Sequence, residues 1–235
     1  MTKPIIAIRG PVVIIPAFNE ENSVGKVVRE IPAGLVREVI VVNNNSNDQT
    51  ALAAARAGAT VLHEPIPGYG RACLCGIAYA RTLTPQPDIA VFLDADYSDF
   101  PAEMPMLIEP IRQDGVDLVI GSRALGNRQR GSMTPQQLFG NWLATSLLRT
   151  IYGVRYTDLG PFRAIRFDAL LALDMQDKTY GWTVEMQLKA AKAGLKSTEV
   201  PVSYRRRIGH SKISGTVRGT VLAGYKIITT IFRYW

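Results

Sequence analysis

Two aspartates at the end of an apolar run are the residues of this chain with the clearest potential for chemistry. In VFLDADYSDF, residues 91–100, Asp94 and Asp96 follow a short apolar stretch, and Asp99 comes soon after. Side chains two positions apart on an extended segment point to the same face, so the carboxylates of Asp94 and Asp96 can converge. Carboxylates are costly to bury unpaired, which predicts a basic side chain, a helix terminus or a metal ion beside them.

A divalent metal is the partner that suits this pair best. Two carboxylates that leave coordination positions open match the preference of Mg²⁺ or Mn²⁺, which are commonly shared with phosphate oxygens. A short D-x-D pattern is common, and a solvated acidic turn is the alternative. The position of Asp94 and Asp96 directly after a buried strand favours the metal site.

Positive charge is concentrated in the second half of the chain. The net charge is +7, yet residues 1–120 hold nine Lys or Arg against fourteen Asp or Glu. Residues 121–166 hold seven arginines against Asp158 alone, and residues 201–235 hold seven basic residues and no acid. This asymmetry predicts an anionic partner, either nucleic acid, a phosphorylated ligand or a membrane surface. The acidic first half and the lack of an aromatic–basic pattern argue against nucleic acid.

Length and composition indicate one large α/β domain in a cytoplasmic protein. The chain has 235 residues, of which 47% are hydrophobic, enough for a substantial core. Cys73 and Cys75 are too close together to suggest a disulfide framework and are expected to be reduced. The N-terminus does not have the pattern of a signal peptide, and no run of about 18 apolar residues could span a bilayer.

Short apolar strands alternate with helical segments through the first 120 residues. Strands are expected at residues 12–17, 38–43, 60–63, 89–94 and 117–121, and helices at 20–31, 46–58, 68–81 and 102–113. Ser46 is the expected N-cap of the second helix, and Gly58 marks its end. This alternation is typical of a Rossmann-like α/β fold, a mostly parallel sheet with helices on both faces.

The loops after these strands are expected to form one ligand-binding edge. PAFNE, NNNSND, DADYSD and GSR each follow a strand directly, and ligands of such sheets bind beyond the carboxyl ends of the strands. The second half is less regular. Helices are expected there at residues 136–153, 183–194 and 213–235, and strands at 161–167 and 197–207.

The motifs, taken in order, resemble those of the family-2 glycosyltransferases of GT-A fold, and most of all the dolichol-phosphate-mannose and polyprenyl-phosphate-glucose synthases. The matching segments are VVIIPAFNEE, VIVVNNNSNDQT, GYGRACLCGIAYA, VFLDADYSD, DLVIGSRALG, TDLGPFRAIR, YGWTVEMQLKA and EVPVSYRRRIGHSKISGT. They cover about residues 11–216. The resemblance implies a single GT-A domain over residues 1–212, followed by a C-terminal amphipathic helix over 213–235.

The resemblance also implies a role for each matching position. The implied donor-binding residues are Pro16, Phe18, Glu20, Val42, Asn44, Asp94, Ala95, Asp96, Arg206 and Lys212, with Asp94 and Asp96 as the metal ligands. Two positions depart from the family pattern. Asn44 stands where an acid is usual, and because an amide both donates and accepts, the base of the donor stays open. Ser98 stands where the family often has a glutamine that binds the metal.

The implied catalytic residues are Asp96, Arg123, Glu185 and Lys212. Arg123 matches an arginine that reaches phosphate groups, and Lys212 belongs, with Arg206, to an R-x-x-G-x-S-K loop that closes over donor and acceptor phosphates. Glu185 matches an acid near the acceptor, with a solvated helix residue as the alternative.

Four other residues near these motifs are expected to have no direct role in binding or catalysis. Arg205 and Arg207 are expected to be solvated surface residues. Tyr180 and Trp182 are expected to pack rather than to bind a ligand.

The charges suggest a mechanism. Displacing a nucleoside diphosphate from sugar C1 leaves negative charge on the departing group, which a divalent ion held by Asp94 and Asp96 would stabilise, assisted by Lys212. A sugar hydroxyl acceptor would need a general base, for which Glu185 or Asp96 is a candidate. A lipid monophosphate, with a second pKa of about 6, is already largely anionic and needs only positioning. A single displacement would invert the anomeric centre.

These inferences predict a metal-dependent, inverting hexosyltransferase that uses a UDP-glucose or GDP-mannose type of donor and a polyprenyl or dolichyl phosphate acceptor. The alternatives are the same donor with a carbohydrate or small-molecule hydroxyl acceptor, and a nucleotidyltransferase that makes sugar nucleotides. The nucleotidyltransferase would need a glycine-rich loop where this chain has PAFNEE.

The C-terminal tail suggests a peripheral position at the cytoplasmic membrane face. In its helix, Arg218, Lys226 and Arg233 fall within about 80° of one another, and apolar residues lie between them. Such a helix can lie in the membrane interface with its basic side toward anionic headgroups. A terminal helix packed on the domain, or a connection to membrane segments, is the alternative.

Overall fold

The described part of the chain, residues 9–209 and 217–234, is built on a seven-stranded sheet in the order β3-β2-β1-β4-β6-β5-β7. The structure is a computed structural model, and for residues 217–223 only the backbone is described. The strands are β1 (Val12–Ala17), β2 (Glu38–Asn43), β3 (Thr60–His63), β4 (Ile89–Phe92), β5 (Leu118–Ser122), β6 (Arg163–Arg166) and β7 (Ser197–Pro201). Strand β6 runs antiparallel to β4 and β5, and the other neighbouring strands pair in parallel. The prediction of a mostly parallel sheet is confirmed.

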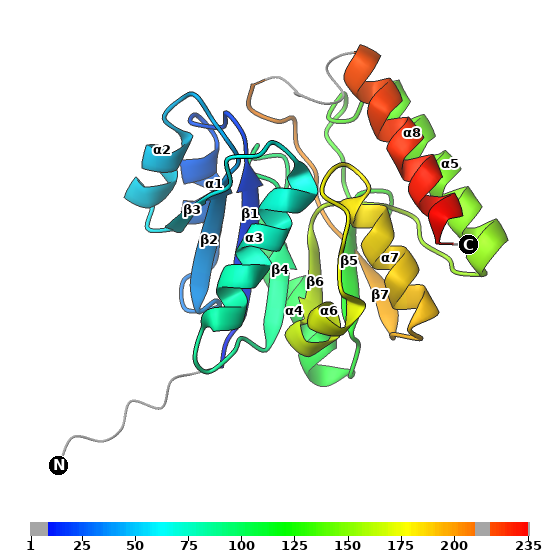
Figure 1. The fold of residues 1–235 in the computed structure, drawn as a ribbon, viewed down its shortest axis with the longest axis horizontal. Helices are drawn as coiled ribbons and strands as arrows, with labels where there is room; N and C mark the ends of the chain where they lie inside the picture. The colour runs from blue at the N-terminus through cyan, green and yellow to red at the C-terminus, as the bar shows by residue number, and fades with distance from the viewer. Residues whose placement is uncertain (1–8, 210–216, 235) are drawn as a thin grey trace.

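Helices cover both faces of the sheet (Figure 1). One face carries α1 (Val24–Glu30), α2 (Thr50–Arg56) and α4 (Met104–Gln113), the last preceded by a 3₁₀ turn at Pro101–Glu103. The other face carries α3 (Tyr69–Thr82), α6 (Phe167–Leu173) and α7 (Trp182–Lys192). The predicted three-layer arrangement is therefore present.

Strand β1 shows why the strands read as unbroken apolar runs. Val12 and Ile14 point into the core beneath α3 and α7, whereas Val13 and Ile15 point into the core beneath α1 and α4. All four side chains are fully buried. A strand covered on both faces has no solvent side, so it carries no alternating polar residues.

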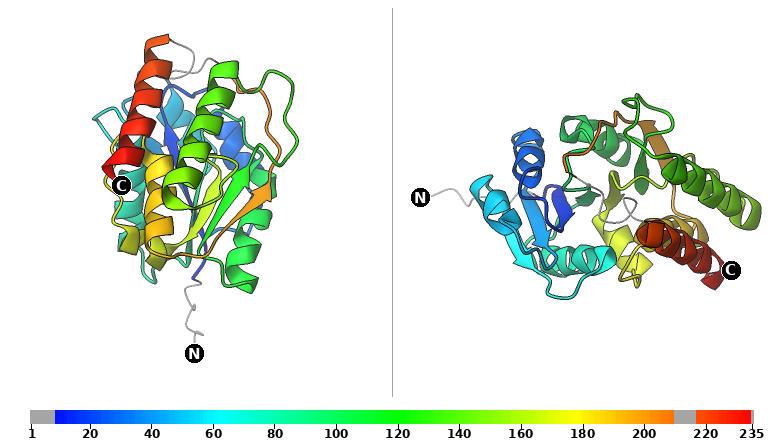
Figure 2. Two further views of the ribbon diagram at one scale, coloured as in Figure 1. Left: turned by 90° about the vertical axis from the view of Figure 1, so that its right-hand side faces the viewer. Right: turned by 90° about the horizontal axis from the view of Figure 1, so that it is seen from above.

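Two further helices, α5 (Pro135–Tyr152) and α8 (Val217–Arg233), form an outer layer against α7 (Figures 1 and 2). Their shared core is small and apolar, with Leu148 of α5, Leu188 of α7 and Ile231 of α8 among its members. The hydroxyl of Tyr152 donates to the carbonyl of Ile231 at 2.6 Å. In the described segments, no helix combines the length and the hydropathy that crossing a bilayer requires.

The structure corrects several predicted boundaries. The predicted strand at 89–94 ends at Phe92, and the one at 197–207 ends at Pro201. Helix α6, which begins directly after β6, was not predicted. Ser46 is not the cap of α2, because its hydroxyl accepts the Asn19 N–H instead. Gly58 follows the end of α2 with a φ of 96°, as predicted.

Candidate active site

The loops that follow β1, β2, β4 and β5 lie together beyond the carboxyl ends of the strands. The backbone N–H of Asn19 donates to the Ser46 hydroxyl at 2.9 Å, which joins the loops after β1 and β2. Asp94 and Arg123, from the loops after β4 and β5, line one cavity. The predicted ligand-binding edge is thus formed by residues from distant parts of the chain.

Asp96 uses its two carboxylate oxygens for different partners. Its Oδ1 atom accepts from the backbone N–H of Ser98 at 2.8 Å and from the Ser98 hydroxyl. Its Oδ2 atom lies 2.7 Å from the Arg207 guanidinium, which also reaches Glu20 at 3.5 Å. Asp96 is almost fully buried. One oxygen therefore fixes the turn, while the other presents a negative charge to a cation.

Asp94 and Asp99 add further carboxylates close to Asp96. Burial, followed by repulsion from Asp96, raises the pKa of Asp94 to about 7. Burial, followed by repulsion from Asp94 and Asp96, also raises the pKa of Asp99. In the described residues, the Oδ1 atom of Asp99 has no hydrogen-bond partner. These crowded carboxyl groups resist ionising together unless a cation balances their charge, so the residues fit the implied Mg²⁺ or Mn²⁺.

The fit involves two carboxylates rather than a complete cage of ligands. Across residues 9–209 and 217–234, no group of three or more His, Cys, Asp or Glu side chains is placed to hold a metal. Ser98 stands at the position where the resemblance implies a metal-binding glutamine, and it directs its hydroxyl to Asp96.

Arg123 is held in place by a buried partner. Its Nε and Nη2 atoms donate to the two oxygens of Asp158 at 2.8 and 2.7 Å, and its guanidinium stacks over the ring of Tyr204 at 5.1 Å. Burial is the largest single effect and works to lower the pKa of Arg123, but the charge and hydrogen bonds of Asp158, together with Tyr204 and Asp99, raise the pKa overall. Arg123 therefore stays charged beside the cavity that it lines.

The expected nucleoside-binding residues occupy different environments. Phe18 is exposed, whereas Pro16 and Glu20 are buried. The side chain of Val42 lies in the core beneath α3, and Ala95 is buried in the opposite core. Phe18 is therefore the one of these five side chains that is open to solvent.

Asn44 supports the loop between β3 and α3. Its amide nitrogen donates to the carbonyls of Glu64 and Ile66 at 3.1 and 2.8 Å, and its oxygen accepts the Gly68 N–H at 2.7 Å. A carboxylate could not donate these two bonds, which explains why an amide replaces the usual acid here.

Glu185 is not brought to the cavity. It is fully buried and accepts from the backbone N–H groups of Gln176 and Asp177 at 2.9 and 2.7 Å. It also accepts from the Tyr234 hydroxyl at 2.6 Å and pairs with Lys189 at 3.0 Å. With these partners, Glu185 anchors a loop and the end of α8 rather than facing an acceptor. The sequence suggested either a general base near the acceptor or a solvated residue on a helix. The buried position of Glu185 matches neither prediction.

The basic segment after β7 also differs from expectation. Arg206 is exposed, and its Nε atom donates to the carbonyl of Arg130 at 3.0 Å, away from the carboxylates. Arg207, expected to be a surface residue, is the one that contacts Asp96. Lys212 lies outside the described residues.

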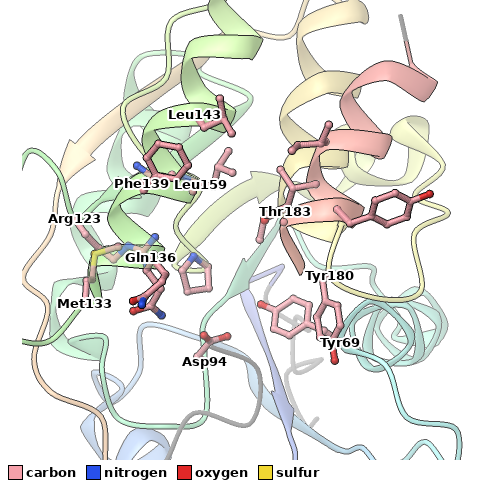
Figure 3. Close-up of a pocket in the computed structure, with 18 residues that line it drawn as sticks. Tyr69, Asp94, Arg123, Met133, Gln136, Phe139, Leu143, Leu159, Tyr180 and Thr183 are labelled. Atoms are coloured by element: carbon pink, nitrogen blue, oxygen red, sulfur yellow. The ribbon is translucent and has the colours of Figure 1, made fainter. Parts of the chain in front are cut away.

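A cavity of about 590 Å³ runs from Asp94 and Arg123 into the space between α5, α7 and α8 (Figure 3). Its far walls are mainly apolar, with Phe139 and Leu143 on α5 and Ile227 and Ile228 on α8. The other residues that line it are Tyr69, Met133, Gln136, Gln137, Gly140, Asn141, Leu159, Pro161, Tyr180, Thr183, Gly224 and Tyr225.

Two of these cavity residues were missed or misread from the sequence. Tyr180, expected to be a packing residue, lines the cavity, while Trp182 packs in the core against Phe92 as expected. Tyr69 carries a buried hydroxyl, and its burial, followed by the charge of Asp94, raises the pKa of that hydroxyl. Its place between two glycines at the start of a helix, on the ligand-binding edge, is the signal that could have identified it.

Comparison with known proteins agrees with this geometry. The sequence model of the family described as Glycosyl transferase family 2 matches residues 12–173 of this chain. An uncharacterized glycosyltransferase of Mycobacterium tuberculosis is 39% identical over 213 residues, which are 90% of this chain and 93% of that protein. The undecaprenyl-phosphate mannosyltransferase of Micrococcus luteus is 32% identical over 221 residues, 88% of each chain.

A solved structure shares the fold. The glucosyl-3-phosphoglycerate synthase of M. tuberculosis, crystallised with Mn²⁺, UDP-glucose and phosphoglyceric acid, superposes with a TM-score of 0.75 and 23% identity, covering 97% of this chain and 80% of that one. This is the GT-A fold that the sequence predicted. The chain belongs to the family-2 glycosyltransferases, and it is a glycosyltransferase enzyme.

Proposed function

We propose that the protein transfers a hexose from a nucleotide-diphospho-sugar, of the UDP-glucose or GDP-mannose type, to a polyprenyl or dolichyl phosphate. The observation that carries this proposal is the shape of the cavity. It begins at Asp94 of the family's donor motif and continues between apolar side chains of α5 and α8. A long isoprenoid chain needs such an apolar wall, whereas a sugar acceptor needs many hydrogen-bonding groups.

The polar end of the cavity suits the phosphate of such an acceptor. Arg123 supplies a fixed positive charge there, and Gln136 and Gln137 line the same space. An acceptor phosphate is largely ionised near neutral pH, so it needs no general base. This is consistent with the position of Glu185, which is buried away from the cavity.

The mechanism follows from these charges. Asp94 and Asp96 would hold Mg²⁺ or Mn²⁺, which supplies a Lewis acid for the departing diphosphate. Arg123 holds the acceptor phosphate beside Asp94 at the cavity end. An oxygen of that phosphate attacks C1 of the hexose, and the bond from C1 to the diphosphate oxygen breaks, which inverts the anomeric centre. The apolar walls contributed by α5 and α8 exclude water that would otherwise hydrolyse the donor.

The similar proteins support both the proposed acceptor and the proposed donor. The M. luteus relative is named for a polyprenyl phosphate acceptor, and the solved M. tuberculosis structure contains Mn²⁺ and UDP-glucose. That structure also contains phosphoglyceric acid, which favours a second candidate, transfer to a hydroxyl of a small phosphorylated molecule. The apolar part of the cavity favours the lipid.

The face at the cavity mouth suits a membrane surface. Phe139 and Trp142 on α5 and Tyr225 on α8 are 61%, 60% and 69% exposed, and their exposed neighbours Leu138 and Phe232 extend the patch. Phe139 and Tyr225 also line the cavity. Exposed aromatic residues are favoured at membrane interfaces, and a polyprenyl chain resides in the bilayer. We therefore infer that this patch rests on the membrane.

Helix α8 has a more limited part in this contact than its sequence predicted. The ammonium group of Lys226 pairs with Asp177 at 3.0 Å, so it is directed toward the domain rather than toward lipid headgroups. Ile231 is buried against α5 and α7. The side chain of Arg218 lies outside the described residues.

A direct assay tests the proposal. Purified protein is incubated with Mn²⁺ or Mg²⁺, a panel of nucleotide sugars, and either a short-chain polyprenyl phosphate, the corresponding polyprenol, or 3-phosphoglycerate. We expect a product only with the polyprenyl phosphate, and we expect EDTA to abolish it. Transfer to phosphoglycerate alone would replace the proposal with the second candidate. Equal transfer to polyprenol and to polyprenyl phosphate would contradict the role given to the phosphate.

A further inference from the structure

Arg207 occupies the position of a cation at the carboxylates of the donor motif. Its Nη2 atom lies 2.7 Å from Asp96 Oδ2 and 3.5 Å from Glu20 Oε1. Both carboxylates are nearly buried, whereas the Arg207 side chain is 30% exposed. The guanidinium therefore covers the oxygen of Asp96 that faces out of the protein.

The backbone on either side of Arg207 is fastened to the same turn. The N–H groups of Arg205 and Ile208 donate to the carbonyls of Ser98 and Asp96 at 2.9 and 3.0 Å. The Arg205 guanidinium also lies over the Tyr97 ring at 3.4 Å from its centre. The placement of Arg207 is thus built into the fold of the segment.

This geometry explains why Arg207, and not its neighbour, faces the site. Alternate side chains of an extended segment point in opposite directions. Arg205 and Arg207 point toward the Asp96 turn, while Arg206 points toward the loop at 129–131, where its Nε atom donates to the Arg130 carbonyl.

Among the described residues, the contact with Asp96 leaves one donor of the guanidinium without a partner. In the described part of the chain, the Nε atom of Arg207 is buried and has no hydrogen-bond partner. A guanidinium offers five N–H donors in a planar fork, which matches two phosphate oxygens at once. Arg207 is therefore suited to bind a phosphate next to the carboxylates.

A divalent cation at Asp96 and the guanidinium of Arg207 compete for the same carboxylate, because the two positive charges repel each other. The diphosphate of a sugar donor carries compensating negative charge next to that cation. It offers Arg207 a new anionic partner within reach of its present position.

We propose that Arg207 is a donor-binding residue with two successive partners. It neutralises Asp96 and Glu20 in the empty enzyme, and it turns to the diphosphate of the donor when a divalent cation takes its place on Asp96. This inference rests on the proposed use of a nucleotide-diphospho-sugar and adds the residue that couples metal binding to donor binding.

Binding measurements on Arg207→Gln test the inference without relying on activity. Mn²⁺ binding in the absence of nucleotide is followed by electron paramagnetic resonance, and binding of UDP and GDP in the presence of Mn²⁺ is followed by calorimetry. Removing the competing positive charge should tighten Mn²⁺ binding about tenfold, and removing the phosphate ligand should weaken nucleotide binding about tenfold or more. Arg207→Lys, which keeps the charge but not the fork, should change nucleotide binding more than Mn²⁺ binding.

Arg130→Gln is the matched control, since it removes the same charge from an exposed position on the loop at 129–131. It should leave Mn²⁺ binding as in the wild type. The inference would be overturned if Arg207→Gln bound Mn²⁺ as the wild type does or more weakly, or if its nucleotide binding were unchanged. A melting curve checks that the variant is folded. Failure of the wild-type enzyme to bind either nucleotide with Mn²⁺ would instead contradict the proposed function.

Discussion

Asp96 shows how one carboxylate can serve both the fold and the site. Its Oδ1 atom closes the turn through Ser98, and its Oδ2 atom faces Arg207. The fold needs an acceptor at the first position, which an amide oxygen also provides. The site needs a negative charge at the second, which an amide lacks.

Asp96→Asn should therefore lose activity while it stays folded. We expect hexose transfer to fall by about 100-fold or more, because the charge proposed to hold the metal is removed. The thermal unfolding midpoint should move by no more than about 4 °C. Asp168→Asn, at an exposed position on α6, is the control and should change neither quantity. An Asp96→Asn enzyme with the wild-type rate would exclude Asp96 as a metal ligand.

Asn44 makes a different prediction, which concerns stability. Asn44→Asp would place a carboxylate against the carbonyls of Glu64 and Ile66, where the amide now donates. We expect the free energy of unfolding to fall by about 2 kcal/mol. Urea denaturation measures this change, with the exposed neighbour Asn45→Asp as the control. Equal losses in both variants would contradict the specific role of the Asn44 amide.

At the residue scale, the sequence alone predicted which candidate residues lie at the ligand-binding edge better than it predicted the contacts that each one makes. Asp94, Asp96 and Arg123 could be chosen because their types and spacing follow strand ends. The choice between Arg206 and Arg207 could not be made, because it depends on which way an irregular segment turns after β7. The role of Glu185 was equally hidden, since its partners include Tyr234, 49 residues away.

At the scale of elements, the ends of helices are tied together by buried polar groups. Glu185 on α7 holds the N–H groups of Gln176 and Asp177 and the hydroxyl of Tyr234. Asp177 in turn pairs with Lys226 on α8. The loop between α6 and α7 is thus fixed by both α7 and α8.

Glu185→Gln separates this anchoring role from a catalytic one. Removing the buried charge should lower the free energy of unfolding by about 3 kcal/mol, since Lys189 loses its partner. The rate per folded molecule should stay within about threefold of the wild type, whereas loss of a general base would cost about 100-fold or more. Chemical denaturation and single-turnover rates at a temperature where the variant is folded measure both.

Tyr234→Phe is the companion variant, because it removes one hydrogen bond to Glu185 and leaves its charge in place. It should lower the free energy of unfolding by about 1 kcal/mol. A large loss of single-turnover rate in Glu185→Gln without loss of stability would restore the catalytic reading.

Helices and strands were predicted accurately where the residues that determine their ends are neighbours in the sequence. Strands β1, β2 and β3 and helix α5 were close to their predicted bounds, because apolar runs and caps near them are local features. Helix α6 has only seven residues and follows β6 without a turn, so its first residue, Phe167, was assigned to the predicted strand and the rest to no element. The C-terminal half of the predicted strand at 197–207 leaves the sheet, because its backbone bonds to the loops at 96–99 and 127–129 instead.

At the scale of the whole molecule, the cavity and the exposed aromatic patch share Phe139 and Tyr225. The cavity could not be predicted from the sequence, because its walls combine α5 with α8, which are about 80 residues apart. The patch was equally hidden, since an apolar residue on a helix reads as a core residue unless its neighbours are known. Trp142, for example, lies in a helix that was predicted correctly, yet it is exposed.

The patch predicts binding to lipid vesicles. The double variant Phe139→Ser with Trp142→Ser should sediment with anionic liposomes about tenfold less than the wild type, because two interfacial aromatic side chains are lost. Leu52→Ser, which removes an exposed apolar residue of α2, should sediment as the wild type does. Equal sedimentation of all three proteins would show that the membrane contact lies elsewhere. Circular dichroism verifies that each variant is folded.

The outer layer of α5 and α8 has a consequence for how such an enzyme could be re-engineered. These two helices share a small core with α7, separate from the two larger cores that hold the sheet and the carboxylates. Under the proposed function, exchanging their cavity-facing residues for those of a homologue should redirect the enzyme to an isoprenoid of another length while preserving its choice of sugar nucleotide. Acceptor and donor selection would then lie in two parts of the fold that can be altered one at a time.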